Sequence, residues 1–203
     1  MSIKITEKDK KVLSKLLKKS VNEIDNIYKF EGYIIGMICG DDIQTPGMMI
    51  KNIFGTPDER GTELNSLDGV NQFLGIYSKI NNKNVLKLQS HIYRPIFAKT
   101  KEQVKEYAYG FRASYRSERI REDGDYNACV SYMIISSIYQ ANEEMCKDDE
   151  DYANLIQRLD KKPLLMLSEA VQTLNQIRLD NYVAPHDVKN NVLGFNYISS
   201  THH

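Results

Sequence analysis

Residues 30–55, FEGYIIGMICGDDIQTPGMMIKNIFG, decide the fold of this chain, because they predict two helices joined by a tight turn. Apolar residues recur at the three-and-four spacing of a helix face, beginning just before the stretch: Ile27, Phe30, Tyr33, Ile34, Met37 and Ile38. This spacing predicts a buried helix over residues 26–39. Thr45 as N-cap, Pro46 at the first helical position and Gly55 beyond the end predict a second helix over residues 46–54.

Three glycines, Gly32, Gly36 and Gly40, follow one another at intervals of four residues. A glycine inside a helix costs about 1 kcal/mol relative to alanine, so we expect a compensating contact with a second backbone on this face. The neighbour is either the helix that carries Gly110 and Phe111 or a second copy of the chain across a two-fold axis. Gly40 is expected to end the helix in the left-handed conformation.

Two later segments, IYRPIF at residues 92–97 and EYAYGFRASY at residues 106–115, accompany the glycine-rich stretch. Together with residues 32–55 they resemble the signature of the YecA/YgfB-like family of uncharacterised bacterial proteins. The resemblance covers about residues 22–140 and implies a helical protein of bacterial origin. The chain has no Trp, which members usually carry in each helix pair, and it lacks the Cys/His-rich zinc tail of some members. The resemblance therefore implies no metal site.

Composition is that of an ordinary globular protein, with 203 residues, 41% hydrophobic and 27% charged. The 27 basic and 27 acidic residues cancel, so no overall field attracts nucleic acid or anionic lipid. The apolar run at residues 33–39 is far shorter than the roughly 20 residues of a membrane span, and no apolar signal segment opens the chain. These features predict a cytoplasmic protein without membrane contact.

The helical period continues through most of the chain. It predicts further helices over residues 7–19, 67–80, 85–92, 100–115, 126–145, 152–161 and 163–179. Thr6 and Thr100 are expected N-caps, and Ser20 with Glu23 forms a capping-box pattern that would start the buried helix as early as Val21. The expected fold is an all-α bundle of about eight helices in a single domain, residues 1–180, with a C-terminal tail over residues 181–203.

One row of arginines is a candidate binding face. Arg112, Arg116 and Arg119 are spaced by four and three residues beside Tyr109 and Tyr115, a pattern that suits phosphate binding with stacking on bases. Acidic residues crowd the same region: Glu118, Glu122, Asp123 and Asp125. Ion pairing on a solvated helix face explains the pattern without a ligand, and we favour that interpretation. The lysine-rich first helix is likewise interpreted as a solvated face rather than a membrane or phosphate contact.

No group of residues has the spacing of a catalytic, cofactor or metal site. The three cysteines, Cys39, Cys129 and Cys146, are widely separated and odd in number. His91 and His186 are isolated, and His202 with His203 has the form of a truncated purification tag. The acidic run at residues 147–151, KDDED, lacks the spaced oxygens of a calcium loop. We therefore assign no catalytic, cofactor-binding or metal-binding residue.

Three functions remain in competition. The first is a non-enzymatic protein-binding or adaptor module that also self-associates as a homodimer, because 13 tyrosines on a chain without Trp suit recognition surfaces. The second is RNA or DNA contact through Arg112, Arg116 and Arg119. An enzyme ranks third, since isolated histidines and scattered carboxylates assemble into no site from sequence.

Overall fold

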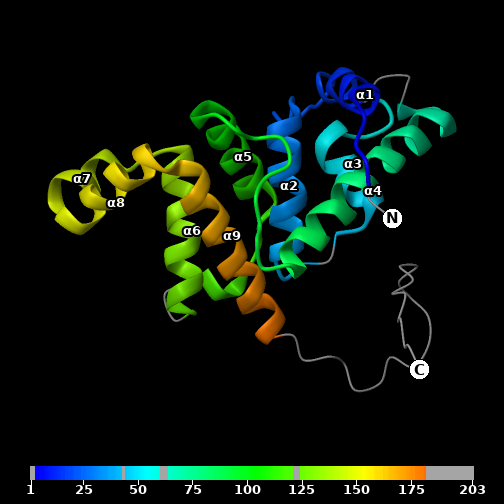
Figure 1. The fold of residues 1–203 in the computed structure, drawn as a ribbon. Helices are drawn as coiled ribbons and strands as arrows, with labels where there is room; N and C mark the ends of the chain where they lie inside the picture. The colour runs from blue at the N-terminus through cyan, green and yellow to red at the C-terminus, as the bar shows by residue number, and fades with distance from the viewer. Residues whose placement is uncertain (1–2, 43, 60–63, 121–123, 182–203) are drawn as a thin grey trace, which may run out of the picture.

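The structure, a computed structural model, describes residues 3–42, 44–59, 64–120 and 124–181 (Figure 1). This part of the chain is helical and contains no strand, which confirms the predicted all-α bundle. Its helices are α1 (Glu7–Leu17), α2 (Ile27–Cys39), α3 (Pro46–Phe54), α4 (Leu67–Gln89), α5 (Lys101–Ser114), α6 (Tyr126–Tyr139), α7 (Glu143–Asp148), α8 (Glu150–Lys161) and α9 (Pro163–Asp180), with a short 3₁₀ helix, η2 (Glu118–Ile120), before α6.

Helix α2 lies at the centre of the molecule. In Figure 1, α1, α3 and α4 lie on one side of it, while α5, α6 and α9 lie on the other, and α7 and α8 form the far end. Every residue from Phe30 to Gly36 is buried, so α2 supplies side chains to two hydrophobic clusters at once. Phe30 and Ile34 belong to the first cluster, and Ile35 and Cys39 belong to the second.

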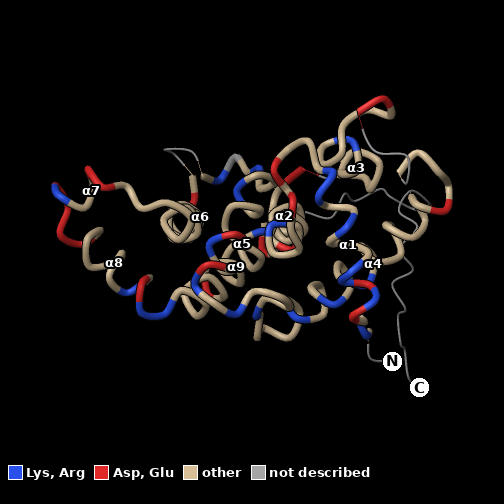
Figure 2. The backbone as a smooth tube through the Cα atoms, turned by 90° about the horizontal axis from the view of Figure 1, so that it is seen from above, with Lys and Arg blue, Asp and Glu red and all other residues tan. Residues whose placement is uncertain are grey.

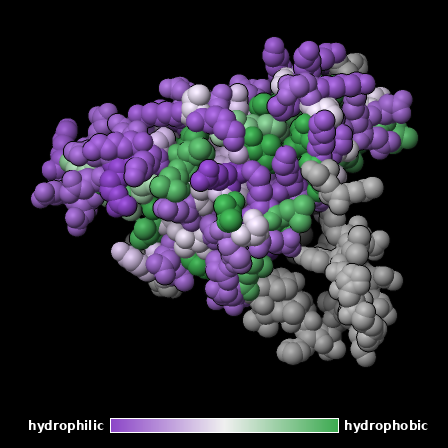
Figure 3. Space-filling model, viewed as in Figure 1, coloured by the Kyte–Doolittle hydropathy of each residue, from purple (hydrophilic) through white to green (hydrophobic). Residues whose placement is uncertain are grey.

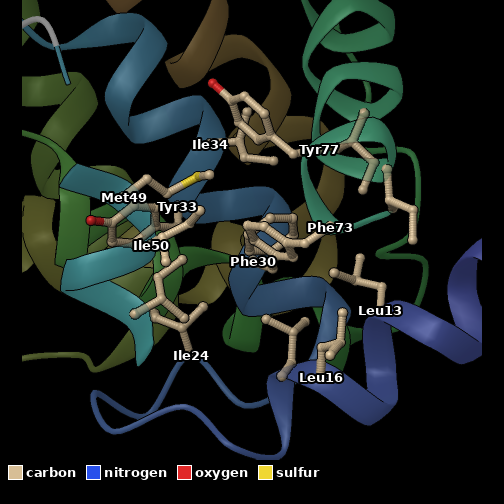
Figure 4. Packing of buried hydrophobic residues seen from close by; sticks show 14 of the residues in the cluster. Leu13, Leu16, Ile24, Phe30, Tyr33, Ile34, Met49, Ile50, Phe73 and Tyr77 are labelled. Atoms are coloured by element: carbon tan, nitrogen blue, oxygen red, sulfur yellow. The ribbon is translucent and has the colours of Figure 1, made fainter. Parts of the chain in front are cut away.

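The first cluster joins α1, α2, α3 and α4 around two phenylalanines. Figure 4 shows Phe30 of α2 beside Phe73 of α4, and their ring centroids are 5.6 Å apart. Phe54 of α3 meets Phe73 edge-on at 5.3 Å. Leu13 and Leu17 of α1 are fully buried against this group, so the short lysine-rich helix is anchored by its apolar stripe as its sequence predicted.

Helices α2 and α5 approach each other backbone to backbone. A Cβ atom at Gly32 would overlap the carbonyl oxygen of Tyr107, and one at Gly110 would overlap the carbonyl oxygen of Lys29. At Gly36 an added Cβ would lie 2.5 Å from the carbonyl oxygen of Phe111. The predicted close contact is therefore confirmed, and the neighbour is the helix with Gly110 and Phe111 of the same chain.

One hydrogen bond crosses this contact. The hydroxyl of Ser114 on α5 donates to the carbonyl oxygen of Tyr33 on α2 at 2.6 Å. Both residues are buried, and only glycine at position 36 leaves room for the serine side chain between the two backbones.

Two helix ends differ from their predictions. Gly40 is extended, with φ −77° and ψ 171°, and not left-handed; an added Cβ there would lie 2.8 Å from the carbonyl oxygen of Arg116, so space and not conformation requires the glycine. Helix α2 starts at Ile27 with Asn26 as N-cap, not at Val21. The Ser20 hydroxyl accepts from the backbone N–H of Asn22 and Ile24 in a turn.

The predicted break at residues 81–84 is also wrong, because α4 runs unbroken from Leu67 to Gln89. Ile80, Asn84 and Leu88 lie four residues apart and are all buried, so burial of one continuous face outweighs the turn preference of the asparagines. Neither polar atom of the buried Asn84 amide has a hydrogen-bond partner.

The predicted helix over residues 126–145 is confirmed as far as Tyr139 and is wrong beyond it. It ends at Tyr139, and α7 begins separately after Asn142, whose side chain accepts from the N–H groups of Glu144 and Met145. The acidic run at residues 147–151 is divided between the end of α7 and the start of α8, and Asp149 is the N-cap of α8.

Several helix starts are confirmed. Thr6 and Thr100 form capping boxes, Thr45 caps α3 with Pro46 in its first turn, and Pro163 opens α9. The predicted tail beyond Asn181 lies outside the described residues. Within the ranges described, no helix is long and apolar enough to cross a membrane.

A buried carboxylate holds the loop between α4 and α5 against α2. Glu31 is fully buried, and its two oxygens accept hydrogen bonds from the backbone N–H groups of Ile96 and Phe97. Burial raises the pKa of Glu31 to about 7, and the two N–H donors with Lys87 and Lys99 oppose that shift. These hydrogen bonds fix the loop between α4 and α5, which contains Pro95. The loop covers the junction of the two clusters, because Phe97 belongs to the first and Ala98 to the second.

We predict opposite effects for two kinds of glycine substitution. Gly32→Ala and Gly110→Ala force two backbones apart and should lower the free energy of unfolding by about 1–3 kcal/mol; Gly36→Leu should lower it further. Gly75→Ala is the matched control, since an added Cβ there has nothing within 4 Å, and it should raise stability by up to about 1 kcal/mol. Urea denaturation measures all four. Equal stability of the Gly110→Ala and Gly75→Ala variants would contradict the close contact.

Glu31 gives a pH dependence with a defined sign. Its pKa in the folded state, about 7, exceeds the ordinary 4.5, so the folded protein binds this proton more tightly than the unfolded chain. The free energy of unfolding should therefore fall as pH rises from about 4.5 through 7, by about 3 kcal/mol from this group. Glu31→Gln should remove that slope in urea titrations, while Glu144→Gln on the exposed surface should keep it. A slope that survives Glu31→Gln would contradict the assignment.

Candidate functional site

A groove of about 770 Å³ lies between α5, the C-terminal end of α6, α7, α8 and the start of α9. Its volume falls within the roughly 300–1,000 Å³ of known ligand pockets. The groove is at the end of the molecule where α7 and α8 project (Figure 1). The outer surface of that end is mainly hydrophilic in Figure 3. The apolar side chains that line part of the groove differ in this respect from the surface around it.

One wall of the groove is a basic stripe on α5. The capping box at Thr100 starts this helix, and Lys101, Lys105 and Arg112 then fall along one face at intervals of four and seven residues. The helical rise of 1.5 Å per residue places Lys105 and Arg112 about 10 Å apart along the axis. The opposite face of α5 packs on α2, which fixes the direction in which the stripe points.

Two of the three cations in this stripe have no acidic partner among the described residues. Lys101 pairs with Asp160 of α8 at 2.7 Å, and this bond links the two walls of the groove. No carboxylate among the residues that the structure describes pairs with Lys105 or Arg112. Lys105 and Arg112 therefore give this wall of the groove two positive charges that are available to bind an anionic group.

Arg112 is the most constrained of these cations. Its guanidinium lies 5.0 Å from the ring centroid of Tyr139, a cation–π contact of about 0.5–2 kcal/mol. The Nε atom of Arg112 is buried and has no hydrogen-bond partner in the part of the chain that the structure describes, which costs about 1–3 kcal/mol for such a group. A hydroxyl in the same groove, that of Ser136, is likewise buried without a partner.

The remaining walls differ in character. The floor is apolar and consists of Ile138, Ile156, Leu159 and Pro163. The opposite lip is acidic, with the exposed Glu143 and Glu144 at the start of α7; Figure 2 marks the acidic residues of α7 in red. The groove therefore combines a basic wall, an apolar floor and an acidic lip.

Tyr152 attaches α7 and α8 to the rest of the molecule. Its buried hydroxyl accepts from the backbone N–H of Asn142 at 3.0 Å and forms a hydrogen bond of 2.8 Å with the Ser137 hydroxyl. The bond from Asn142 uses a lone pair of the Tyr152 oxygen and not its proton. The Tyr152 hydroxyl is therefore free to donate to Ser137. This side chain fixes α8 to the end of α6 and to the segment before α7.

The arginine row predicted on one helix face is not continuous. Helix α5 ends at Ser114, and Tyr115 is extended with φ −65° and ψ 123°. Arg116 turns back to the chain and donates to the carbonyl oxygens of Arg112, Ala113 and Tyr115. Only Arg112 of the row reaches the groove.

Arg119 has a partner that the sequence did not reveal. It lies in η2 and pairs with Asp41, just beyond the end of α2. Of the neighbouring acidic residues that we expected to pair with the row, Asp125 instead caps α6 by accepting from the N–H of Ala128. Glu122 and Asp123 lie outside the described residues. Ion pairing of Arg119 is thus real, but it is tertiary and not intrahelical.

Groups that support covalent or metal chemistry are dispersed. Among the residues described, no three of the types His, Cys, Asp and Glu gather in a metal-binding arrangement. Cys39 is buried beside α9, and burial raises the pKa of its thiol to about 12. His91 is exposed with φ 55° at the end of α4. The chemistry of the groove is that of ion pairs, hydrogen bonds and apolar contacts.

The lysine-rich face of α1 has partial ion pairing. Lys10 pairs with Glu7 at 2.7 Å, and Asp9 of the same helix accepts from Lys79 of α4 at 3.0 Å. Lys8, Lys11 and Lys18 are exposed. This arrangement agrees with the solvated face expected from the sequence.

Comparisons of the chain with protein-family models, with curated proteins and with solved structures find no match. The groove is therefore interpreted from its own geometry.

We predict that Tyr152→Phe loosens α7 and α8. Losing the hydroxyl removes the hydrogen bond from the N–H of Asn142 and takes its partner from the buried Ser137 hydroxyl, which should cost about 1–3 kcal/mol. Limited trypsin digestion should cleave the variant faster at Arg158 and Lys161. Tyr126→Phe is the control, because Tyr126 is 79% exposed. Unchanged cleavage in Tyr152→Phe would show that this hydroxyl does not hold the helices.

Proposed function

We propose that this protein is a non-enzymatic protein-binding module, and that its partner occupies the groove between α5, α6, α7 and α8. The observation that carries the proposal is Arg112, which has no acidic partner among the described residues and lies over the Tyr139 ring in the wall of a groove with an apolar floor. Arginine and tyrosine are enriched in the energetically dominant parts of interfaces, where an apolar centre is surrounded by a polar rim. The lysines and glutamates at the margins of the groove supply such a rim.

Nucleic acid is the alternative ligand. Arg112, Arg116 and Arg119 would have to act together on phosphates, but Arg116 is bound to backbone carbonyls and Arg119 to Asp41. The chain also carries no net charge, and counterion release from a phosphate backbone needs several free cations on one surface. These contacts favour a protein partner.

We include two further expectations in the proposal. The chain is a member of the YecA/YgfB-like family, as its glycine-rich helices indicate, and it self-associates as a homodimer. Light scattering on the purified chain checks the second expectation: a dimer has twice the mass of one chain. If the mass measured at high concentration is that of a single chain, the chain does not self-associate, and its partner is a different protein.

Site-specific photo-crosslinking tests the proposed function. A benzophenone amino acid in place of Lys105 lies in the groove wall, whereas the same group in place of Lys51 lies on the exposed face of α3. In cells that carry the protein, position 105 should yield a defined protein adduct that position 51 does not. The partner identified by mass spectrometry should then bind the purified protein.

The contradicting result concerns nucleic acid. If the wild type binds RNA or DNA oligonucleotides with a steep salt dependence, and the variant with Arg112, Arg116 and Arg119 replaced by Ala does not, the nucleic-acid function replaces the proposal. If position 105 yields no adduct beyond that of position 51, the groove is not the binding surface.

A further inference from the structure

We infer that the groove recognises an acidic peptide segment, with one carboxylate of the peptide on Arg112 and a second on Lys105. The inference rests on the proposed function and specifies the chemistry of the partner. Its occupant is a short segment of a protein chain and not a whole domain face, because the groove is a hollow of about 770 Å³ lined by residues from α5 to α9, the volume of a ligand pocket.

The position of the Arg112 guanidinium in the free protein already suits the binding of a carboxylate. Its guanidinium lies over the Tyr139 ring, 5.0 Å from the centroid, and the planar guanidinium of arginine binds a carboxylate through two parallel hydrogen bonds. The buried Nε–H is left without a partner in the free protein. An acidic side chain that approaches along the groove would supply the missing acceptor for this donor.

Lys105 sets the spacing of the second acidic residue. It is exposed, has no acidic partner in the described part of the chain and lies about 10 Å from Arg112 along α5. An extended peptide advances about 3.3 Å per residue, so carboxylates three residues apart span this distance. The pattern expected in the peptide is therefore an acidic residue, two intervening residues and a second acidic residue.

The opposite lip distinguishes a peptide from other anions. Glu143 and Glu144 face the groove from α7, and they would repel a polymer that carries a negative charge on every unit. A peptide can place its acidic side chains on the α5 wall and its apolar side chains on Ile156, Leu159 and Pro163. The charge asymmetry of the groove thus selects an acidic segment that also contains apolar residues.

Selection from a random dodecamer phage library on the full-length protein tests this inference. We expect enrichment of peptides with two acidic residues three apart, flanked by Leu, Ile or Phe. A synthetic enriched peptide should bind at least tenfold more weakly to Arg112→Gln and several-fold more weakly to Lys105→Gln. Arg112→Lys should recover part of the affinity, since it keeps the charge without the planar fork.

The control is Arg116→Gln, because Arg116 lies outside the groove and bonds to backbone carbonyls. It should bind the peptide as the wild type does. Circular dichroism and the melting temperature confirm that each variant is folded, and Arg112→Lys keeps the test valid if Arg112→Gln is destabilised.

The outcomes separate the inference from the proposed function. Enriched peptides without acidic residues, or with affinities that Arg112→Gln and Lys105→Gln leave unchanged, would overturn the inference, as would the absence of any enriched peptide. Crosslinking at position 105 judges the proposed function independently, so a groove-specific protein adduct combined with a failed selection leaves the module a protein binder whose partner is not an acidic segment.

Discussion

The backbone contact between α2 and α5 is the constraint on which the rest of the structure depends. Gly32 and Gly36 on one helix and Gly110 on the other remove the side chains that would hold the axes apart. The buried hydroxyl of Ser114 donates to the carbonyl oxygen of Tyr33 across this contact, so the serine hydroxyl has an acceptor between the two backbones. Because the middle of α2, residues 30–36, is buried on all sides, this helix joins two hydrophobic clusters that would be separate without it.

The same contact positions the candidate groove. One face of α5 is fixed on α2, and a neighbouring face packs on α6 through the second cluster. The stripe with Lys101, Lys105 and Arg112 is what remains exposed, and it faces the hollow under α7 and α8. Those two helices are joined to the bundle by the hydroxyl of Tyr152 and by the ion pair of Lys101 with Asp160. Helix α5, which is packed on α2, therefore supplies the cations of the groove. Helices α7 and α8, which are joined to the bundle by fewer contacts, supply the opposite wall.

Local sequence signals predicted much of this fold. Capping residues and helix-starting prolines, such as Thr100 and Pro46, act within one turn of the chain, so their effect is visible without tertiary structure. The glycine spacing predicted the close approach, and the helix with Gly110 and Phe111 was one of the two neighbours expected. The prediction was wrong where burial outweighs local preference. The asparagines at residues 81–84 favour a turn, yet α4 continues through them because Ile80 and Leu88 share one buried face.

Long-range polar contacts could not be predicted, because their partners are far apart in the chain. Glu31 binds backbone N–H groups 65 and 66 residues away, and Arg119 pairs with Asp41 78 residues away. The groove has the same origin, since its residues come from α5 to α9. Sequence reasoning selected Arg112 as a candidate but placed it in a helical row, which ends where α5 ends at Ser114.

Native-state hydrogen exchange tests the central role of the α2–α5 contact most directly. If the two backbones form one unit, the slowest amides of residues 27–39 and 101–114 should exchange with the same free energy, equal to that of global unfolding, whereas amides of residues 143–161 should exchange at lower free energy. Exchange of α5 amides well before those of α2 would contradict the account, because it would show that the helices separate while the rest of the fold persists.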